Sequence, residues 1–192
     1  MPRRVDREAR QRQVSEAAWR VLLRDGLEGL SVRNVAAEAG LPQSSLRYTF
    51  PTVASVRERA LGLVSERLRA RVDALDPAAP GRARALLLEL LPLDAERRVE
   101  MEVYLALGTA AMTDPTLREA HRAAQEGVRR VCEEALDALP PAPRRADGRG
   151  SLEVSDVHAL VDGLALHLVR QDPDAPTGWA VEVLDAHLAR LS

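Results

Sequence analysis

The chain has 192 residues, a formal net charge of -2 and a hydrophobic share of 46%, which are ordinary values for a soluble globular protein of one large or two small domains. Cys132 is the only cysteine, which excludes an intrachain disulfide and a cysteine metal cluster and fits a reducing cytoplasm. No apolar run approaches the roughly 18 residues that a membrane span needs, so we expect a cytoplasmic protein that is neither exported nor inserted in a membrane.

The charge is distributed unevenly along the chain. Residues 1–70 hold 13 Arg against 8 Asp and Glu, a balance of +5, and residues 71–192 hold 14 Arg against 21 Asp and Glu, a balance of -7. A basic N-terminal part favours contact with nucleic-acid phosphates at that end. The alternative is an ordinary solvated surface, since the excess of +5 is modest.

Prolines divide the chain into segments with helical periodicity. All 12 prolines fall at or between predicted helix ends, as the sterics of a helix interior require. We predict an all-α fold of about nine helices, with a three-helix head in a domain of residues 1–52 and a larger helical body in a domain of residues 53–192. Residues 140–150 are predicted to form a loop. The predicted helices cover 6–25, 32–39, 43–49, the stretch from after Pro51 to about 75, 81–91, 94–112, 115–138, 152–171 and 176–191.

The stretch from Ser31 to Thr52, SVRNVAAEAGLPQSSLRYTFPT, predicts two short helices around a tight turn. Apolar residues at positions 32, 35, 36 and 39 follow helical spacing behind Ser31 as N-cap, and Gly40 supplies the left-handed conformation that ends the helix. Pro42 precedes the second helix, where its missing N–H costs nothing. The outward side chains of that second helix suit base edges and phosphate oxygens, and they are Gln43, Ser44, Ser45, Arg47 and Tyr48.

These residues resemble the N-terminal domain of the TetR family of transcriptional repressors over about residues 8–60. The shared pattern is a basic first helix, the segment DGLEGLSVRNVAAEAG, and a recognition helix that ends in an aromatic pair before proline. Pro42, Arg47 and Val53 depart from the family's usual Ser, Tyr and Lys. The resemblance implies that Ser31 touches phosphate. Independently of it, the position of Arg3 and Arg4 before the first helix predicts either a DNA-contacting arm or a solvated terminus. The predicted DNA-binding residues are Ser31, Arg33, Gln43, Ser44, Ser45, Arg47, Tyr48, Thr52, Arg3 and Arg4.

Two later segments, EVYLALGTAAMTDPTLREAHR and ALVDGLALHLV, resemble the C-terminal domain of the BetI-like subgroup of that family. The resemblance implies a homodimer built on a four-helix bundle of the last two helices. Apolar stripes along those two helices agree with a dimer, although a single chain can instead bury both stripes inwardly. The predicted dimer-interface residues are Val157, Val161, Gly163, Leu164, Leu168, Val183, Leu184 and Leu188.

A small-molecule site is predicted around the helix of residues 94–112, where soft apolar side chains alternate with two hydroxyl groups. The alternative is that these side chains simply fill the core. The BetI-like resemblance raises a choline-type ligand, but the body has only two aromatic residues and a quaternary ammonium cage needs several. The predicted ligand-binding residues are Met101, Tyr104, Leu105, Thr109, Met112 and Trp179.

No motif indicates an enzyme. The sequence has no glycine-rich phosphate loop, no HExxH, no GxSxG and no Cys–His pair at metal-ligand spacing. Histidines are interpreted as packed or solvated, and Glu96, Glu100 and Glu102 as surface charges on a helix. We therefore expect no catalytic residue, cofactor or metal.

The predicted function is a ligand-responsive repressor that binds a near-palindromic operator on double-stranded DNA as a homodimer and is released by a small-molecule effector. Two alternatives stay open. One is a small-molecule-binding helical protein with a degenerate DNA-reading head, and the other is a helical enzyme with an unrecognised site.

Overall fold

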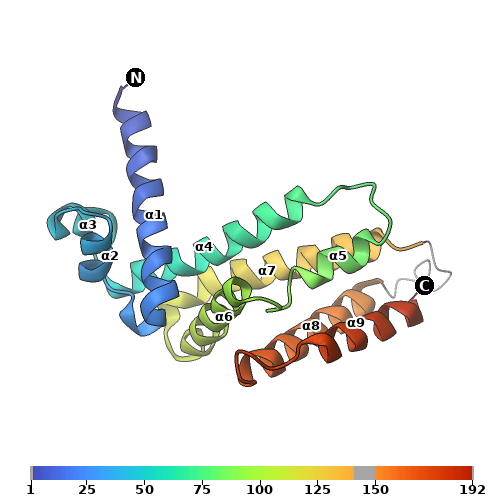
Figure 1. Ribbon diagram of the computed structural model, residues 1–192. Helices are drawn as coiled ribbons and strands as arrows, with labels where there is room; N and C mark the ends of the chain where they lie inside the picture. Colours follow the sequence, from blue (N-terminus) through green and yellow to red (C-terminus); the bar gives the residue numbers. More distant parts are fainter. Residues whose placement is uncertain (1, 141–149, 192) are drawn as a thin grey trace. The chain divides into compact units, whose positions relative to one another are not determined.

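The structure is a computed structural model that describes residues 2–140 and 150–191. Over these residues the chain is all-helical with nine helices and no strand, as predicted (Figure 1). The predicted loop at 140–150 falls almost entirely outside the described residues. The helices are α1 (Pro2–Gly29), α2 (Val32–Glu38), α3 (Gln43–Thr49), α4 (Val53–Ala74), α5 (Arg82–Leu88), α6 (Ala95–Thr113), α7 (Pro115–Asp137), α8 (Gly150–Arg170) and α9 (Gly178–Leu191).

The chain divides into two compact units. Unit 1 comprises residues 1–64 and 103–121, and unit 2 comprises residues 65–102 and 122–192. The helical head of unit 1 is formed by α1, α2, α3 and the start of α4. The predicted domain boundary between residues 52 and 53 stays a prediction.

Unit 1 is held together by α1, whose inner face is apolar at helical spacing. Val21 and Leu22 of α1 are 0% and 1% exposed. Helical geometry breaks at Gly26, where φ is 65° and ψ is -168°, and only glycine adopts that backbone readily. The break lies where the sequence predicted the first helix to stop. From α4, Arg59 donates two hydrogen bonds to the nearly buried Ser15 hydroxyl of α1, at 3.1 and 2.6 Å.

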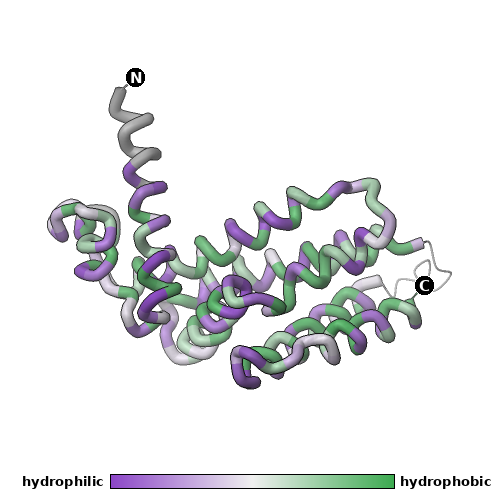
Figure 2. The backbone as a smooth tube through the Cα atoms, viewed as in Figure 1, coloured by the Kyte–Doolittle hydropathy of each residue, from purple (hydrophilic) through white to green (hydrophobic). Residues whose placement is uncertain are grey.

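Unit 2 has its own core, built from α4, α5, α7, α8 and α9. Figure 2 shows hydrophobic residues predominating along α8 and α9. The hydrophobic residues that α8 and α9 bury, among them Val157 and Leu184 at 0% exposed, pack with Leu86, Leu87 and Cys132 in one cluster. No helix among the described residues is long and apolar enough to cross a membrane.

One residue interpreted as a surface charge is buried. Glu100 of α6 is only 4% exposed, which corrects that prediction. Its carboxylate accepts hydrogen bonds from Arg71 at 2.9 and 2.7 Å and from Arg67 Nε at 3.1 Å. A buried carboxylate needs such compensation because leaving water is costly for a charge. Periodicity alone missed these partners, which lie on α4, about 30 residues away in the sequence.

Candidate nucleic-acid interface and ligand site

The turn between α2 and α3 is fixed by backbone and capping hydrogen bonds. Ser31 is the N-cap of α2, and its Oγ accepts the Asn34 N–H at 3.1 Å. At the other end, Gly40 has φ 65°, its N–H donates to Ala37 O at 3.1 Å, and the Leu41 N–H donates to Ala36 O at 2.9 Å. This pair of bonds is a Schellman motif, which turns the chain sharply at the glycine. The turn therefore fixes how α3 begins, as the sequence predicted.

The short helix α3 turns its polar side chains outward. Leu46 is 2% exposed and anchors the helix in unit 1, while Gln43, Ser44 and Arg47 are exposed and Ser45 is half-buried. Exposed amide, hydroxyl and guanidinium groups on one short helix suit contact with base edges and phosphates. The side chains of Tyr48, Arg3 and Arg4 lie outside the described residues.

Thr52, a predicted DNA contact, is exposed at the start of α4. Its Oγ1 accepts the Ser55 N–H at 3.1 Å, and the Ser55 Oγ accepts the Thr52 N–H at 3.3 Å. These reciprocal bonds satisfy backbone donors that a helix start leaves free. Thr52 and Ser31 thus both have capping roles, and neither role prevents the hydroxyl group from meeting a phosphate.

Arginines of unit 1 differ in whether carboxylates neutralise them. Arg20 and Arg24 of α1 both bind Glu38 of α2, each at 2.7 Å. These hydrogen bonds, that of Arg20 first, hold the pKa of Glu38 below its ordinary value. By contrast, Arg33 on α2 and Arg47 on α3 are exposed and have no carboxylate partner among the described residues. The two guanidinium groups are therefore available to an external anion.

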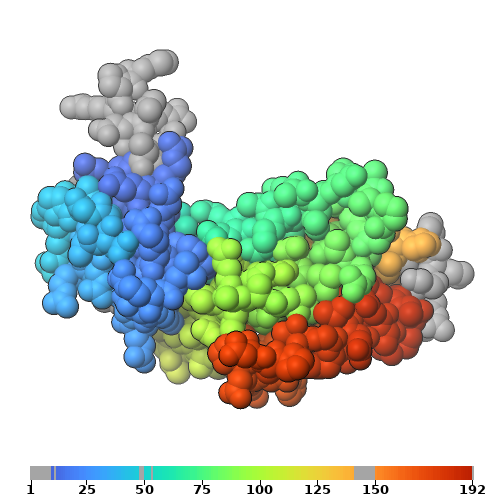
Figure 3. Space-filling view, viewed as in Figure 1, coloured from blue at the N-terminus to red at the C-terminus, as the bar shows by residue number. Residues whose placement is uncertain are grey.

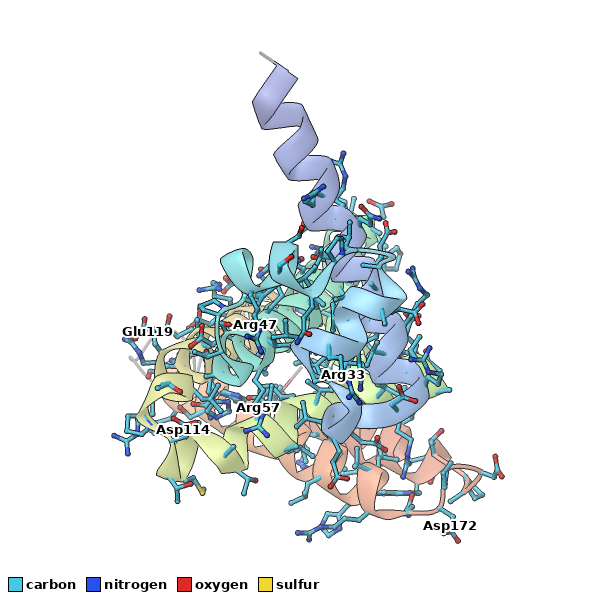
Figure 4. The ribbon with its side chains drawn as sticks, turned by 90° about the vertical axis from the view of Figure 1, so that its left-hand side faces the viewer. Arg33, Arg47, Arg57, Asp114, Glu119 and Asp172 are labelled. Carbon is cyan, nitrogen blue, oxygen red and sulfur yellow. The ribbon has the colours of Figure 1, made fainter. Side chains whose placement is uncertain are left out.

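A third arginine of unit 1 was missed by the sequence analysis. Arg57, in the first turns of α4, is half-buried, and Figure 4 labels it with Arg33 and Arg47 on the side turned toward the viewer. The pKa of Asp114 is lowered, first by hydrogen bonds from Thr116 and further by the charges of Arg57 and Arg118. Arg57 sits beside residues predicted to face inward, so hydropathy gave no signal of a surface role.

The six predicted ligand-binding residues do not share one environment. Tyr104 is 9% exposed and packs against His121, with ring centroids 5.5 Å apart, whereas Met112 is 78% exposed. Thr109 is exposed and donates its hydroxyl to Leu105 O at 3.0 Å. The exposure of the Met112 and Thr109 side chains argues against a place for them in the lining of a cavity. The small-molecule site itself stays a prediction.

The remaining two residues of that set belong to unit 2. Met101 and Trp179 are partly buried against the unit 2 core. Trp179 Nε1 donates to Gln171 Oε1 at 3.3 Å, and its ring lines an open depression with His167 and Arg170.

A groove of about 440 Å³ lies between α4 and α7 in unit 2. None of the six predicted ligand residues lines it. The groove could not be read from the sequence, because three of its five α7 residues are small and resemble an ordinary helix surface. The lining residues are Ser65, Glu66, Leu68, Arg69, Ala70, Asp73, Ala123, Ala124, Gly127, Arg130 and Val131.

The predicted dimer-interface stripe is mostly inside the chain. Six of its eight residues are 0–8% exposed, so they pack in the unit 2 core and do not form a surface for a second copy. Only Gly163 and Val183 remain accessible, Val183 at 42%. The structure therefore agrees with the alternative, in which one chain buries most of both stripes. The buried six are Val157, Val161, Leu164, Leu168, Leu184 and Leu188.

A glycine-closed turn between two short helices, each with an exposed arginine that no carboxylate of the described residues pairs, is typical of a helix-turn-helix protein. The family model for the C-terminal part of BetI-type transcriptional repressors matches residues 79–192. The chain therefore belongs to the TetR family of transcriptional regulators, in the group with a BetI-type C-terminal domain.

Relatives and solved structures agree with this assignment. The HTH-type transcriptional regulator PksA of Bacillus subtilis is 36% identical over 171 residues, covering 87% of this chain and 82% of PksA. A transcriptional regulator from Rhodococcus sp. Rha1 is 28% identical, with 94% of each chain covered and a TM-score of 0.74. The multidrug binding protein EbrR, in complex with imidazole, is 33% identical, with 100% of this chain and 93% of EbrR covered and a TM-score of 0.66. EbrR has also been solved with proflavin and with ethidium.

Proposed function

We propose that this TetR-family regulator is a ligand-responsive repressor that binds a near-palindromic operator through α3. One observation supports operator binding most directly. Arg33 and Arg47, on either side of the turn at Gly40, are both exposed and have no carboxylate partner among the described residues. Arg47 on the recognition helix is suited to base edges, because a guanidinium group makes bidentate contacts with guanine. Arg57 is suited to phosphate, which carries no sequence information.

The repressor acts as a homodimer, since two recognition helices must reach half-sites about 34 to 36 Å apart. The exposed and half-exposed positions of α8 and α9 supply a face for the second copy. Leu152 is 71% exposed, and a Cβ at Gly163 would meet no atom within 4 Å, so another helix can approach its backbone closely. Both helices belong to the outer surface of unit 2 (Figure 3). The proposed face consists of Leu152, Ala159, Gly163, Leu166, Val183 and Ala186, which recur at helical spacing.

A small molecule bound in the C-terminal part releases the operator. The ligands named for EbrR support a small-molecule effector in this group of proteins. In the proposed mechanism, the ligand shifts α4 and thereby changes the separation of the two recognition helices. The effector lowers operator affinity only to the extent that it binds the shifted state more tightly.

Fluorescence anisotropy with labelled DNA tests operator binding. The duplexes are the region upstream of the protein's own gene and a scrambled sequence, each at several salt concentrations. We expect binding to the upstream DNA to be tighter by about a thousandfold or more, with log affinity falling linearly in log salt. Ligand binding without salt-dependent affinity for any duplex would instead favour the degenerate-head alternative.

Variants of Arg47 and Arg57 assign the roles of these two arginines. Arg47→Ala is expected to weaken operator binding by about 10- to 100-fold and random DNA much less, whereas Arg57→Ala weakens both nearly equally. Arg122→Ala, on the exposed surface of α7 in unit 2, is the matched control and should change neither affinity. Equal losses on operator and random DNA for Arg47→Ala would refute its base-reading role.

A further inference from the structure

The groove between α4 and α7 has an apolar floor and no aromatic lining. Leu68 of α4 and Val131 of α7 are its larger apolar residues, and small residues of α7 line it beside them, namely Ala123, Ala124 and Gly127. A volume of about 440 Å³ lies within the range of small-molecule sites. Without an aromatic ring, the groove offers a flat polycyclic ligand no stacking partner. Its volume and lining suit an aliphatic chain.

Charges on the rim of the groove are not all compensated. Arg69 binds Glu134 at 3.0 Å and Asp73 at 3.9 Å, so two carboxylates already neutralise its charge. Glu66 has an interaction partner of its own. Arg130 is exposed and has no ion-pair partner among the described residues. One guanidinium group at the edge of an apolar groove is therefore free to bind an anion.

We infer that this groove binds an amphiphile with one anionic head group, such as a carboxylate, and an aliphatic chain. The head group pairs with Arg130, and the chain lies on Leu68 and Val131. Along α4 the lining runs from Ser65 to Asp73, a length of roughly 12 Å at the helical rise, which matches a chain of medium length. This inference rests on the proposed function, because it names the chemical class of the effector.

The groove also places the ligand against the helix whose position matters in the proposed mechanism. Residues 65, 66, 69, 70 and 73 of α4 line the groove, while Arg67 and Arg71 of the same helix bind Glu100 of α6. A ligand between α4 and α7 therefore contacts one side of α4, and the Glu100 carboxylate of α6 holds α4 on another side. An occupied groove shifts α4 only by working against those hydrogen bonds.

Isothermal titration calorimetry on the full chain without DNA tests the chemical class. The probes are decanoate and decyltrimethylammonium, which share a chain and differ in the sign of the head group, both below their micelle-forming concentrations. We expect decanoate to bind at one site per chain and the ammonium compound at least tenfold more weakly. Arg130→Gln should lower decanoate affinity about tenfold or more, because it removes a charge-assisted hydrogen bond. Arg122→Gln, on the same helix outside the groove, is the control and should leave the affinity unchanged.

Two further variants test the location. Gly127→Leu fills the groove, and the backbone accepts a Cβ there because, among the described residues, the side-chain atom that it would meet within 4 Å is Arg130 Nη2 at 3.9 Å. Ala123→Leu, at an exposed lining position, fills it independently if the first variant folds poorly. Both should reduce decanoate binding at least tenfold with unchanged helical circular dichroism. Full binding to a folded groove-filling variant, equal affinity in Arg130→Gln, preference for the ammonium probe, or no decanoate binding would each overturn the inference.

The outcome is distinguishable from failure of the proposed function. Calorimetry reports groove binding whether or not the protein recognises an operator, and anisotropy reports operator binding whether or not decanoate is present. Operator binding without decanoate binding leaves the repressor proposal standing and removes only the ligand class. Decanoate binding that fails to release the operator separates the groove from regulation and overturns the effector role.

Discussion

Arg71 of α4 and Glu100 of α6 form a bidentate pair, with Nη1 to Oε1 at 2.9 Å and Nη2 to Oε2 at 2.7 Å. Burial of the Arg71 side chain would lower its pKa, but the hydrogen bonds and charges of Glu100 and Glu89 outweigh it and raise that pKa above its ordinary value. Arg71 Nε also donates to Glu89 at 2.8 Å. The pair thus joins α4 to α6 and, through Glu89, to the end of α5.

Removing the carboxylate of this pair should be costly. Glu100→Ala is expected to lower the free energy of unfolding by about 3 kcal/mol, because it leaves half-buried guanidinium groups without their main partner. Glu102→Ala removes an exposed carboxylate two residues away, which pairs with Arg98 at 3.2 Å, and should cost about 0.5 kcal/mol. Urea denaturation of both variants measures the difference. Similar losses for the two would show that the buried pair adds no more than a surface pair.

The proposed dimer face predicts the effect of a charge introduced on it. Ala159→Arg places a guanidinium group among Leu152, Gly163 and Leu166 and should convert the dimer to a monomer in sedimentation velocity experiments. The control Ala138→Arg, just after α7 and also exposed, should leave the dimer intact. Operator affinity should fall with dimer content. A dimer that persists in Ala159→Arg would place the interface elsewhere.

Two helical glycines are expected to respond oppositely to alanine. A Cβ at Gly108 of α6 would lie 2.7 Å from His121 Cε1 and 3.2 Å from its Nε2, so the His121 ring, packed on Tyr104, must move. A Cβ at Gly127 meets nothing closer than 3.9 Å. Gly127→Ala should stabilise the chain by roughly 0.5 to 1 kcal/mol through helix propensity. Gly108→Ala should destabilise it, because the cost of overpacking, about 1 to 3 kcal/mol, exceeds that gain. Thermal unfolding of the two variants shows whether each substitution raises or lowers the stability. Stabilisation by both would mean that the His121 ring moves aside at little cost in free energy.

The ion pairs of Glu38 predict a pH dependence in the head. The pKa of Glu38 is lowered in the folded chain, first by the hydrogen bond from Arg20 and then by that from Arg24. A carboxylate with a lowered folded pKa adds stability above its unfolded pKa, about 4.3, and loses it as the pH falls through the folded value.

Glu38→Gln should therefore destabilise the chain at pH 7 and have a smaller effect at pH 3. Urea denaturation at the two pH values provides the comparison. The control is Glu28→Gln, an exposed residue without an ion pair among the described residues. An effect of Glu38→Gln that does not change with pH would contradict the role of its charge.

The helices and the turn before α3 were predictable because their signals are local. Ser31, Gly40 and Pro42 act within one or two turns of the backbone, through capping, a positive φ and a missing donor. Such effects do not depend on distant partners. For the same reason, Gly26 marked the break in α1, and the prolines marked the ends of the later helices.

Tertiary structure alone decided which charges and stripes are buried. Glu100 is indistinguishable from Glu102 in the sequence, and only the approach of Arg71, 29 residues away, separates the buried carboxylate from the exposed one. The apolar stripe of α8 was visible in the sequence, but periodicity does not say whether a stripe faces its own core or a second copy. Packing within unit 2 settled that choice, because Val157 and Leu164 meet the unit 2 core and leave Ala159 and Gly163 outside. Local signals determine elements, whereas burial depends on which elements the folded chain brings together.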